Sequence, residues 1–158
     1  MVQSPLNITL ASPDETACCA VSLGADLVCG DTVLLHGPVG AGKTHFARQL
    51  IQSLLVEPED VPSPTFTLVQ VYETTAGALW HTDLYRINSS FEIEELGLLE
   101  AFETAICLVE WPDRLAELAP KTALNVTLAQ GETENARILT AEWTADRWQA
   151  PMQKWATQ

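Results

Sequence analysis

Positive charge is scarce in this chain of 158 residues: 8 Lys and Arg residues stand against 21 Asp and Glu residues, and the formal net charge is −13. A field of that sign repels nucleic acids, anionic membranes and nucleotides at long range. We therefore expect no direct binding of tRNA, and any nucleotide must be held by local contacts. The acidic surface suits a basic protein partner instead.

Signals for membrane insertion and for metal-binding cysteines are also missing. No segment approaches the roughly 20 apolar residues of a membrane span, and no basic region followed by an apolar run begins the sequence. The four cysteines, at positions 18, 19, 29 and 107, lie within or beside apolar segments and lack the paired spacing of zinc ligands. We expect a cytoplasmic protein without membrane association, whose cysteines are reduced packing residues.

The most specific segment present is a phosphate-binding loop. Residues 37–44 read Gly37-Pro38-Val39-Gly40-Ala41-Gly42-Lys43-Thr44 and match the P-loop pattern at every specified position. A short buried strand is predicted before the loop at 32–36, and apolar residues recur at helical spacing after it. In such a loop the glycines turn N–H groups inward, the lysine reaches the outer phosphates, and the threonine hydroxyl binds Mg²⁺. A glycine-rich turn that binds nothing is the alternative.

The remaining pattern predicts the fold. An edge strand at 6–10, a helix from Pro13 to about Leu27, and the P-loop strand and helix form a βαβα half, which favours a parallel sheet. A hairpin is expected from strands at 67–72 and 78–85, then an amphipathic helix over 91–102 and a buried strand at 105–109. A second hairpin at 124–128 and 138–143 precedes a tail whose tryptophans cover the core. The sequence thus predicts one α/β domain over 1–158, P-loop NTPase-like, with a mostly parallel central sheet, antiparallel hairpin additions and flanking helices.

Two carboxylates are candidates for the chemistry of hydrolysis. Glu110 ends the apolar run at 105–109, and the carboxyl ends of strands in an open α/β sheet form its ligand-binding edge. Asp83 shares one strand face with His81 and Tyr85 by alternation. We assign Glu110 to the magnesium shell and Asp83 to a metal-bound water or the attacking water. Capping or salt-bridged carboxylates are the alternative, and His81 is interpreted as an ordinary strand histidine.

The segment after the P-loop helix has the features of a switch loop. Its sequence is Val61-Pro62-Ser63-Pro64-Thr65-Phe66, in which two prolines disfavour a helix and two hydroxyls are exposed. Many nucleotide switches place a phosphate-sensing segment at this position. We favour that role over a plain connector.

Five motifs in a fixed order resemble the TsaE family. They are Gly-Ala-Gly-Lys-Thr at 40–44, Ser-Pro-Thr-Phe at 63–66, His-Thr-Asp-Leu-Tyr-Arg at 81–86, Glu-Glu-Leu-Gly at 94–97 and Val-Glu-Trp-Pro at 109–112, and the resemblance runs from about 14 to 128. It implies a small P-loop ATPase, using ATP and Mg²⁺, in tRNA threonylcarbamoyladenosine biosynthesis. Its implied partners are TsaD and TsaB, which themselves transfer the threonylcarbamoyl group.

The resemblance also implies residue roles. Lys43 contacts phosphate, Thr44 and Glu110 hold magnesium, and Asp83 assists hydrolysis. Thr65 belongs to the switch loop, and Trp111 lies near the nucleotide or else in the core. Two residues depart from the family pattern: Pro38 stands where an acid is frequent and removes an N–H donor, and His45 stands in the nucleotide-binding set where a second threonine is common.

Two other functions remain open from the sequence. A stand-alone small-molecule kinase would use the P-loop and an acid near His81, yet the eight basic residues are scattered and form no clustered cationic lid. Arg86 and Arg114 could neutralise transition-state charge, but neither lies in an arginine-finger context. A non-catalytic module whose interactions depend on nucleotide is the other possibility.

Overall fold

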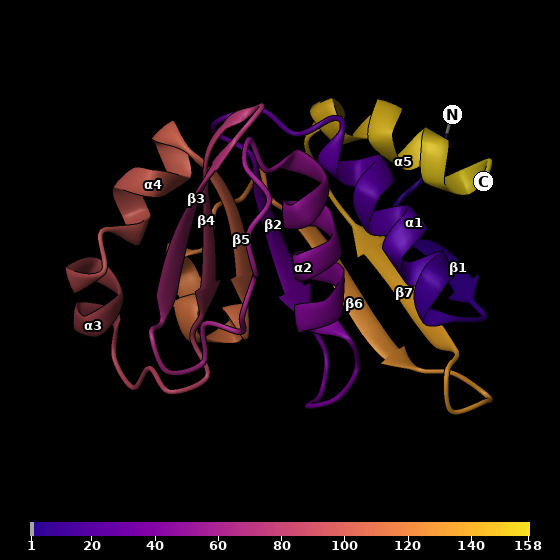
Figure 1. Ribbon diagram of the computed structural model, residues 1–158, viewed down its shortest axis with the longest axis horizontal. Coiled ribbons are helices and arrows are strands. Elements are labelled where there is room, and N and C mark those ends of the chain that lie inside the picture. Colours follow the sequence, from indigo (N-terminus) through magenta and orange to yellow (C-terminus); the bar gives the residue numbers. More distant parts are fainter. Residues whose placement is uncertain (1) are drawn as a thin grey trace.

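One mixed sheet of seven strands forms the centre of the computed structural model, which describes residues 2–158 (Figure 1). Its strand order is β1-β7-β6-β2-β5-β4-β3. Central strands β6, β2, β5 and β4 run parallel, whereas β3, β7 and β1 pair antiparallel with their neighbours. The bounds are β1 Leu6–Leu10, β2 Thr32–His36, β3 Val69–Thr74, β4 Gly77–Asp83, β5 Ile106–Glu110, β6 Leu124–Gln130 and β7 Arg137–Glu142. The predicted α/β class, with a parallel centre and antiparallel additions, is confirmed.

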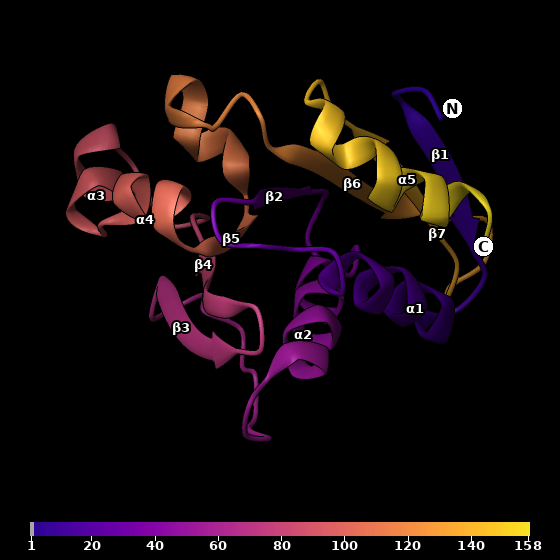
Figure 2. The ribbon, with the colours of Figure 1, turned by 90° about the horizontal axis from the view of Figure 1, so that it is seen from above.

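Helices cover both faces of this sheet. Helices α1 (Pro13–Gly24), α2 (Lys43–Leu54) and α5 (Gln149–Ala156) enclose the larger hydrophobic cluster on one face. Helices α3 (Ser90–Glu95), α4 (Leu98–Thr104) and η1 (Pro112–Leu118) enclose the smaller cluster. Seen from above, α3 and α4 lie on the opposite side of the sheet from α2 (Figure 2). The short η2 (Asp146–Trp148) leads into α5.

The carboxyl-terminal tail packs into the core, as predicted. Trp148, Met152 and Trp155 are all buried, and the Trp155 ring meets Phe46 of α2 edge-on at 6.3 Å between centroids. Pro151 lies in the first turn of α5, where a missing N–H is tolerated. These apolar side chains of the tail therefore cover the core on the side of α1 and α2.

Three local expectations are corrected by the structure. The single helix expected over 91–102 is wrong: α3 and α4 are separate, because Gly97 between them adopts a left-handed φ of 78°. Helix α1 ends at Gly24 rather than near Leu27. The first hairpin has a tighter turn than expected, since β3 continues to Thr74, whose hydroxyl donates to the Gly77 carbonyl at 2.6 Å.

The cysteines follow the expectation only in part. All four are free thiols, but Cys18 and Cys29 are exposed and only Cys19 and Cys107 are buried. Burial raises the pKa of Cys19 to about 11 and the pKa of Cys107 to about 12. Both buried thiols are therefore protonated at neutral pH and act as small apolar packing groups.

No helix within residues 2–158 combines the length and the apolar character that a membrane crossing requires.

An ion pair between the partly exposed Arg147 and the buried Asp31 connects the tail to the start of β2. Asp31 is buried, and Arg147 from η2 donates to both of its carboxylate oxygens, with Nε 2.7 Å from Oδ1. The Val28 N–H donates to the same carboxylate at 2.8 Å. A second pair, Lys154 with Asp26 at 2.9 Å, lies closer to solvent because the Lys154 side chain is 55% exposed.

We expect Arg147→Ala to lower the free energy of unfolding by about 2 kcal/mol, because hydrogen bonds to a charged group contribute roughly 1.5–3 kcal/mol and Asp31 stays buried. Lys154→Ala is the matched control, with an expected change of about 0.5 kcal/mol or less for an exposed pair. Urea unfolding followed by tryptophan fluorescence measures both. Equal losses in the two variants would contradict the assignment of Arg147 as the fastening residue.

Candidate functional site

The register of the parallel strands brings the predicted carboxylates to the P-loop. The carboxyl ends of β2, β5 and β4 meet at the lower edge of the sheet in Figure 1. Glu110 at the end of β5 is aligned with Leu35 of β2 on one side and with Asp83 of β4 on the other. Because the P-loop starts at Gly37, both acids lie beside it.

Glycine is required at two points of the loop for different reasons. Gly42 has a left-handed φ of 104° and caps α2, whose first residue is Lys43. Gly37 has a φ of 139°, and a Cβ there would lie 2.4 Å from the Leu128 carbonyl oxygen of β6. The loop therefore turns sharply at both ends while it stays close to the sheet.

The Lys43 side chain folds back over its own loop. Its ammonium donates to the carbonyl oxygens of Gly37 and Pro38, the latter at 3.1 Å, and lies 3.8 Å from the centroid of the Trp111 ring. Burial lowers the pKa of Lys43 below its ordinary value, and nearby carboxylates oppose that shift. These carboxylates belong to Glu110, Asp83 and Asp113. The single cation of the loop is thus surrounded by acids, which favour its charged form.

Glu110 is held at both carboxylate oxygens. The Thr44 hydroxyl donates to Oε1 at 2.8 Å, and a hydrogen bond of 2.7 Å joins Oε2 to Nε2 of His81. Glu110 is 2% exposed and His81 is fully buried. The other ring nitrogen of His81, Nδ1, has no partner among residues 2–158. The carboxylate therefore points one oxygen at the P-loop threonine and is fixed from behind by the imidazole.

Asp83 attaches the predicted switch loop to the sheet. Its Oδ2 accepts a hydrogen bond from the Thr65 hydroxyl at 3.2 Å, and its Oδ1 accepts one from the Tyr85 N–H at 2.9 Å. The hydroxyls of Ser63 and Thr65 are 2.7 Å apart. The loop at 61–66 is therefore connected through hydroxyl groups to Asp83, the carboxylate that we expect to hold a metal-bound water or the attacking water.

Trp111 covers one side of the site in a strained backbone conformation. Its φ of 57° and ψ of 51° are left-handed, which is unfavourable for a bulky residue. The indole ring contacts the Tyr85 ring at 4.9 Å between centroids, in addition to the Lys43 ammonium. The turn after Glu110 thus directs an aromatic side chain over the P-loop, where the family resemblance expects one.

These groups line one cavity of about 460 Å³, which is within the size range of small-molecule sites. Three residues of the predicted nucleotide-binding set, Gly37, Pro38 and Ala41, do not line it. The lining residues are Val39, Gly40, Gly42, Lys43, Thr44, His45, Thr65, Asp83, Tyr85, Glu110 and Trp111.

The donor set fits a nucleotide with magnesium. Thr44 and Glu110 offer a hydroxyl and a carboxylate oxygen, the hard ligands that Mg²⁺ prefers, and Lys43 offers an ammonium for phosphate. No cluster of three or more His, Cys, Asp or Glu side chains suited to a metal occurs in the described residues. A P-loop does not need one, because phosphate and water oxygens complete the magnesium shell.

Two contacts of the site could not be found from local sequence patterns. Strand alternation predicts that Tyr85 shares a face with Asp83, but the contact of Tyr85 with Trp111 depends on the turn after β5. Arg137 of β7 donates to the carbonyls of Ala41, at 2.9 Å, and Gly40, at 3.4 Å. Its guanidinium therefore braces the outer side of the P-loop from a position 96 residues further along the chain.

The two arginines considered for charge neutralisation lie elsewhere. Arg86 sits over the Phe66 ring at 5.3 Å from its centroid, and Arg114 donates to the Tyr85 carbonyl at 3.3 Å. Neither lines the cavity.

Comparison with known proteins agrees with this geometry. The family model described as "Threonylcarbamoyl adenosine biosynthesis protein TsaE" matches residues 10–139. The chain is 40% identical over 119 residues to the tRNA threonylcarbamoyladenosine biosynthesis protein TsaE of Rickettsia bellii, covering 75% of this chain and 83% of the relative. Identity to the protein of the same name from Mycobacterium bovis is 35% over 144 residues, with 85% of each chain covered. The crystal structure of Bacillus subtilus YdiB superposes with a TM-score of 0.77 at 27% identity, over 99% of this chain and 97% of that one.

We expect His81→Leu to lower the free energy of unfolding by about 1–3 kcal/mol, because Oε2 of Glu110 stays buried without its partner. His81→Gln is the control, since its amide can still donate a hydrogen bond, and its loss should be clearly smaller. Chemical denaturation of both variants measures the difference. Losses of the same size would show that packing of the ring, rather than the bond to Glu110, is what His81 contributes.

Proposed function

Because the chain belongs to the TsaE family, we propose that it is an ATPase that binds ATP with Mg²⁺ and supports the TsaD and TsaB subunits. The role in tRNA threonylcarbamoyladenosine biosynthesis comes with the family. The hydrolysis, the metal and the two partners are the further content of the proposal. It includes a cytoplasmic location and no direct contact with tRNA or a membrane, in keeping with the net charge of −13.

The 2.8 Å hydrogen bond between Thr44 and Glu110 carries this proposal. It joins the P-loop hydroxyl to the acid at the end of β5, the two oxygen ligands that would hold magnesium. Lys43 is close enough to its own loop to exchange the Gly37 and Pro38 carbonyls for phosphate oxygens. A bound Mg–ATP would supply the phosphoanhydride bond, together with a cation that offsets the charge developing on it.

Asp83 is the group best placed to orient a water. Its carboxylate lines the cavity next to Glu110 in the register, and each oxygen keeps a free lone pair beside the bonds to Thr65 and Tyr85. A carboxylate of this kind accepts the proton of a water at Oδ2 or directs the water by hydrogen bonding. The Thr65 hydroxyl fixes that oxygen and links it to the switch loop.

The composition of the cavity supports slow turnover by the chain alone. Among the described residues that line it, Lys43 is the only Lys or Arg side chain. Phosphoryl transfer depends on cationic groups that stabilise the spread charge of the transition state. A second subunit that closes over this edge would add what the chain lacks, which is why we expect partners to stimulate hydrolysis.

ATP turnover tests the proposal directly. We expect weak hydrolysis by the chain alone and clear stimulation by TsaD together with TsaB, measured as phosphate release. Equal rates with and without the two subunits would count against the partnership. Transfer of phosphate from ATP to a metabolite, rather than to water, would identify a small-molecule kinase instead.

We expect Asp83→Asn to lower kcat by about 10²- to 10⁴-fold, the range for loss of a general base, while nucleotide affinity changes little. Asp60→Asn at an exposed position is the matched control and should retain the activity of the unaltered chain. Steady-state turnover and calorimetric titration with a non-hydrolysable ATP analogue separate the two effects. An ATPase should lose both turnover and cellular function in Glu110→Ala. If that variant kept cellular function while nucleotide binding persisted, the chain would be a non-catalytic interaction module.

A further inference from the structure

A second hollow lies beside the switch loop, away from the phosphate cavity. We call it the α3 groove: a space of about 490 Å³ between helix α3 and the loop after β4. The residues that define it here are Phe66, Leu68, Arg86, Phe91, Glu92 and Glu95. None of them lines the cavity that holds Lys43 and Glu110.

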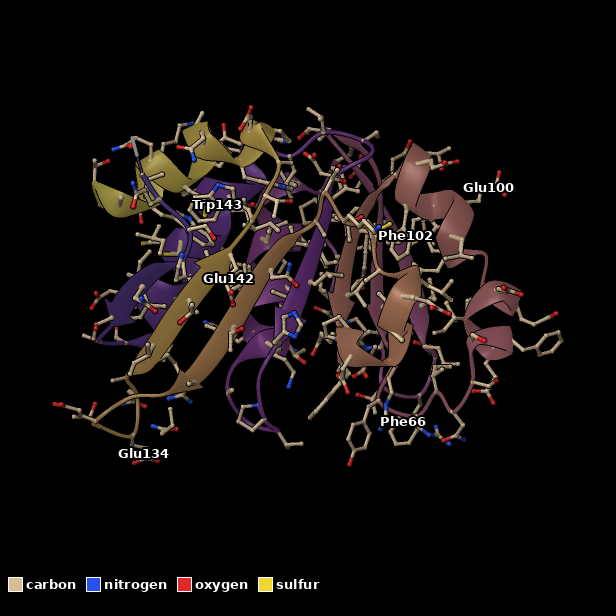
Figure 3. The ribbon with its side chains drawn as sticks, turned by 180° about the vertical axis from the view of Figure 1, so that it is seen from behind. Phe66, Glu100, Phe102, Glu134, Glu142 and Trp143 are labelled. Carbon is tan, nitrogen blue, oxygen red and sulfur yellow. The ribbon has the colours of Figure 1, made fainter. Side chains whose placement is uncertain are left out.

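Two phenylalanines at this groove are unusually open to solvent. Phe66 is 83% exposed and Phe91 is 66% exposed. Figure 3 shows Phe66 projecting from the lower edge of the molecule. Large apolar side chains gathered at a hollow mark interaction sites, because covering them removes apolar area from water. Aromatic residues are also the usual anchors of protein interfaces.

Charge around the groove selects what can cover it. Glu92 and Glu95 contribute two carboxylates, while the one cation, Arg86, already lies over the Phe66 ring at 5.3 Å. The chain as a whole carries a charge of −13, so a second copy of it or a nucleic acid would be repelled. A protein segment with an apolar side chain next to Lys or Arg is complementary to the groove, because the apolar side chain can cover the phenylalanines and the cation can pair with the carboxylates.

The groove is connected to the phosphate cavity through one short loop. Phe66 directly follows Thr65, which donates to Asp83. The loop then passes through Leu68, whose left-handed φ of 68° is strained for a leucine. Leu68 is fixed by its N–H to the Pro64 carbonyl at 2.7 Å, and its own carbonyl accepts the Asp83 N–H at 3.0 Å. Contact at Phe66 therefore acts on a loop that is tied at two points to the Asp83 strand end.

We propose that the α3 groove docks a segment of a partner protein that presents an apolar side chain flanked by Lys or Arg, and that stimulation of turnover passes through this contact. The inference rests on the proposed function, since the partner to be tested is the TsaD–TsaB pair. Phe91 supplies the apolar anchor point, Glu95 supplies the complementary charge, and Phe66 connects the docked segment to Thr65.

Two substitutions test the groove without touching the phosphate cavity. Phe91→Ser removes the anchor and Glu95→Lys reverses the rim charge. Their matched controls are Val28→Ser, at a residue 57% exposed on another part of the surface, and Glu142→Lys at an exposed position of β7. Figure 3 shows Glu142 on β7, away from Phe66. Affinity for the purified TsaD–TsaB pair is measured by calorimetry, and ATP turnover is measured with and without the pair.

We expect Phe91→Ser and Glu95→Lys to weaken binding of TsaD–TsaB about tenfold or more and to abolish stimulation, with basal turnover and nucleotide affinity unchanged. Both controls should bind within about twofold of the unaltered chain, as surface changes outside an interface do. If the unaltered chain binds TsaD–TsaB and neither groove variant weakens that binding, the groove inference fails while the proposed partnership stands. No binding by the unaltered chain would overturn the partnership, and the groove inference with it. Self-association or tRNA binding that Phe91→Ser abolishes would assign the groove to a different occupant and overturn the proposal.

Discussion

The site depends above all on the register between β2, β5 and β4. Glu110 reaches both Thr44 and His81 because it is the last residue of β5, aligned with Leu35 and Asp83 on the neighbouring strands. A slip of one residue would turn its carboxylate to the other face of the sheet. The fully buried β5 prevents such a slip, since every residue from Ile106 to Glu110 packs on one hydrophobic cluster or meets the site. The chemistry is therefore positioned by the packing of apolar neighbours.

Among the described residues that line the cavity, Lys43 is the only Lys or Arg side chain, and most of it is buried. Lys43 is buried between its own loop carbonyls, an aromatic ring and three carboxylates. That arrangement leaves Lys43 as the local positive charge that we propose contacts phosphate, within a protein that is negative at long range. It also provides no second Lys or Arg side chain, among the described residues of the cavity, to stabilise the negative charge of a transition state. This composition is typical of a subunit that receives such a group from a partner protein.

Much of the fold and the central part of the site could be predicted from the sequence, because their signals are local. The P-loop, the apolar run before Glu110 and the strand alternation around Asp83 are each contained within a few residues. The rest depends on contacts between distant segments: His81 meets Glu110 across 29 positions, and Arg137 reaches Ala41 across 96. The split of the helix at Gly97 was missed for another reason. A glycine in an amphipathic pattern is compatible with either a continuous helix or a break, and tertiary packing decides between them.

The contact of Arg137 with the P-loop connects the outer β6–β7 hairpin to the candidate site. Residues 132–135 form an exposed turn, the kind of place where insertions are usually tolerated. Yet the guanidinium of Arg137, which donates to the Ala41 carbonyl, also donates to the Glu134 carbonyl in this turn at 2.8 Å. The turn therefore helps to position the guanidinium against the P-loop. Changes of length in the turn would be transmitted to the loop that we propose binds phosphate. The length of this peripheral turn is thus constrained through Arg137, which is the residue that connects the turn to the P-loop.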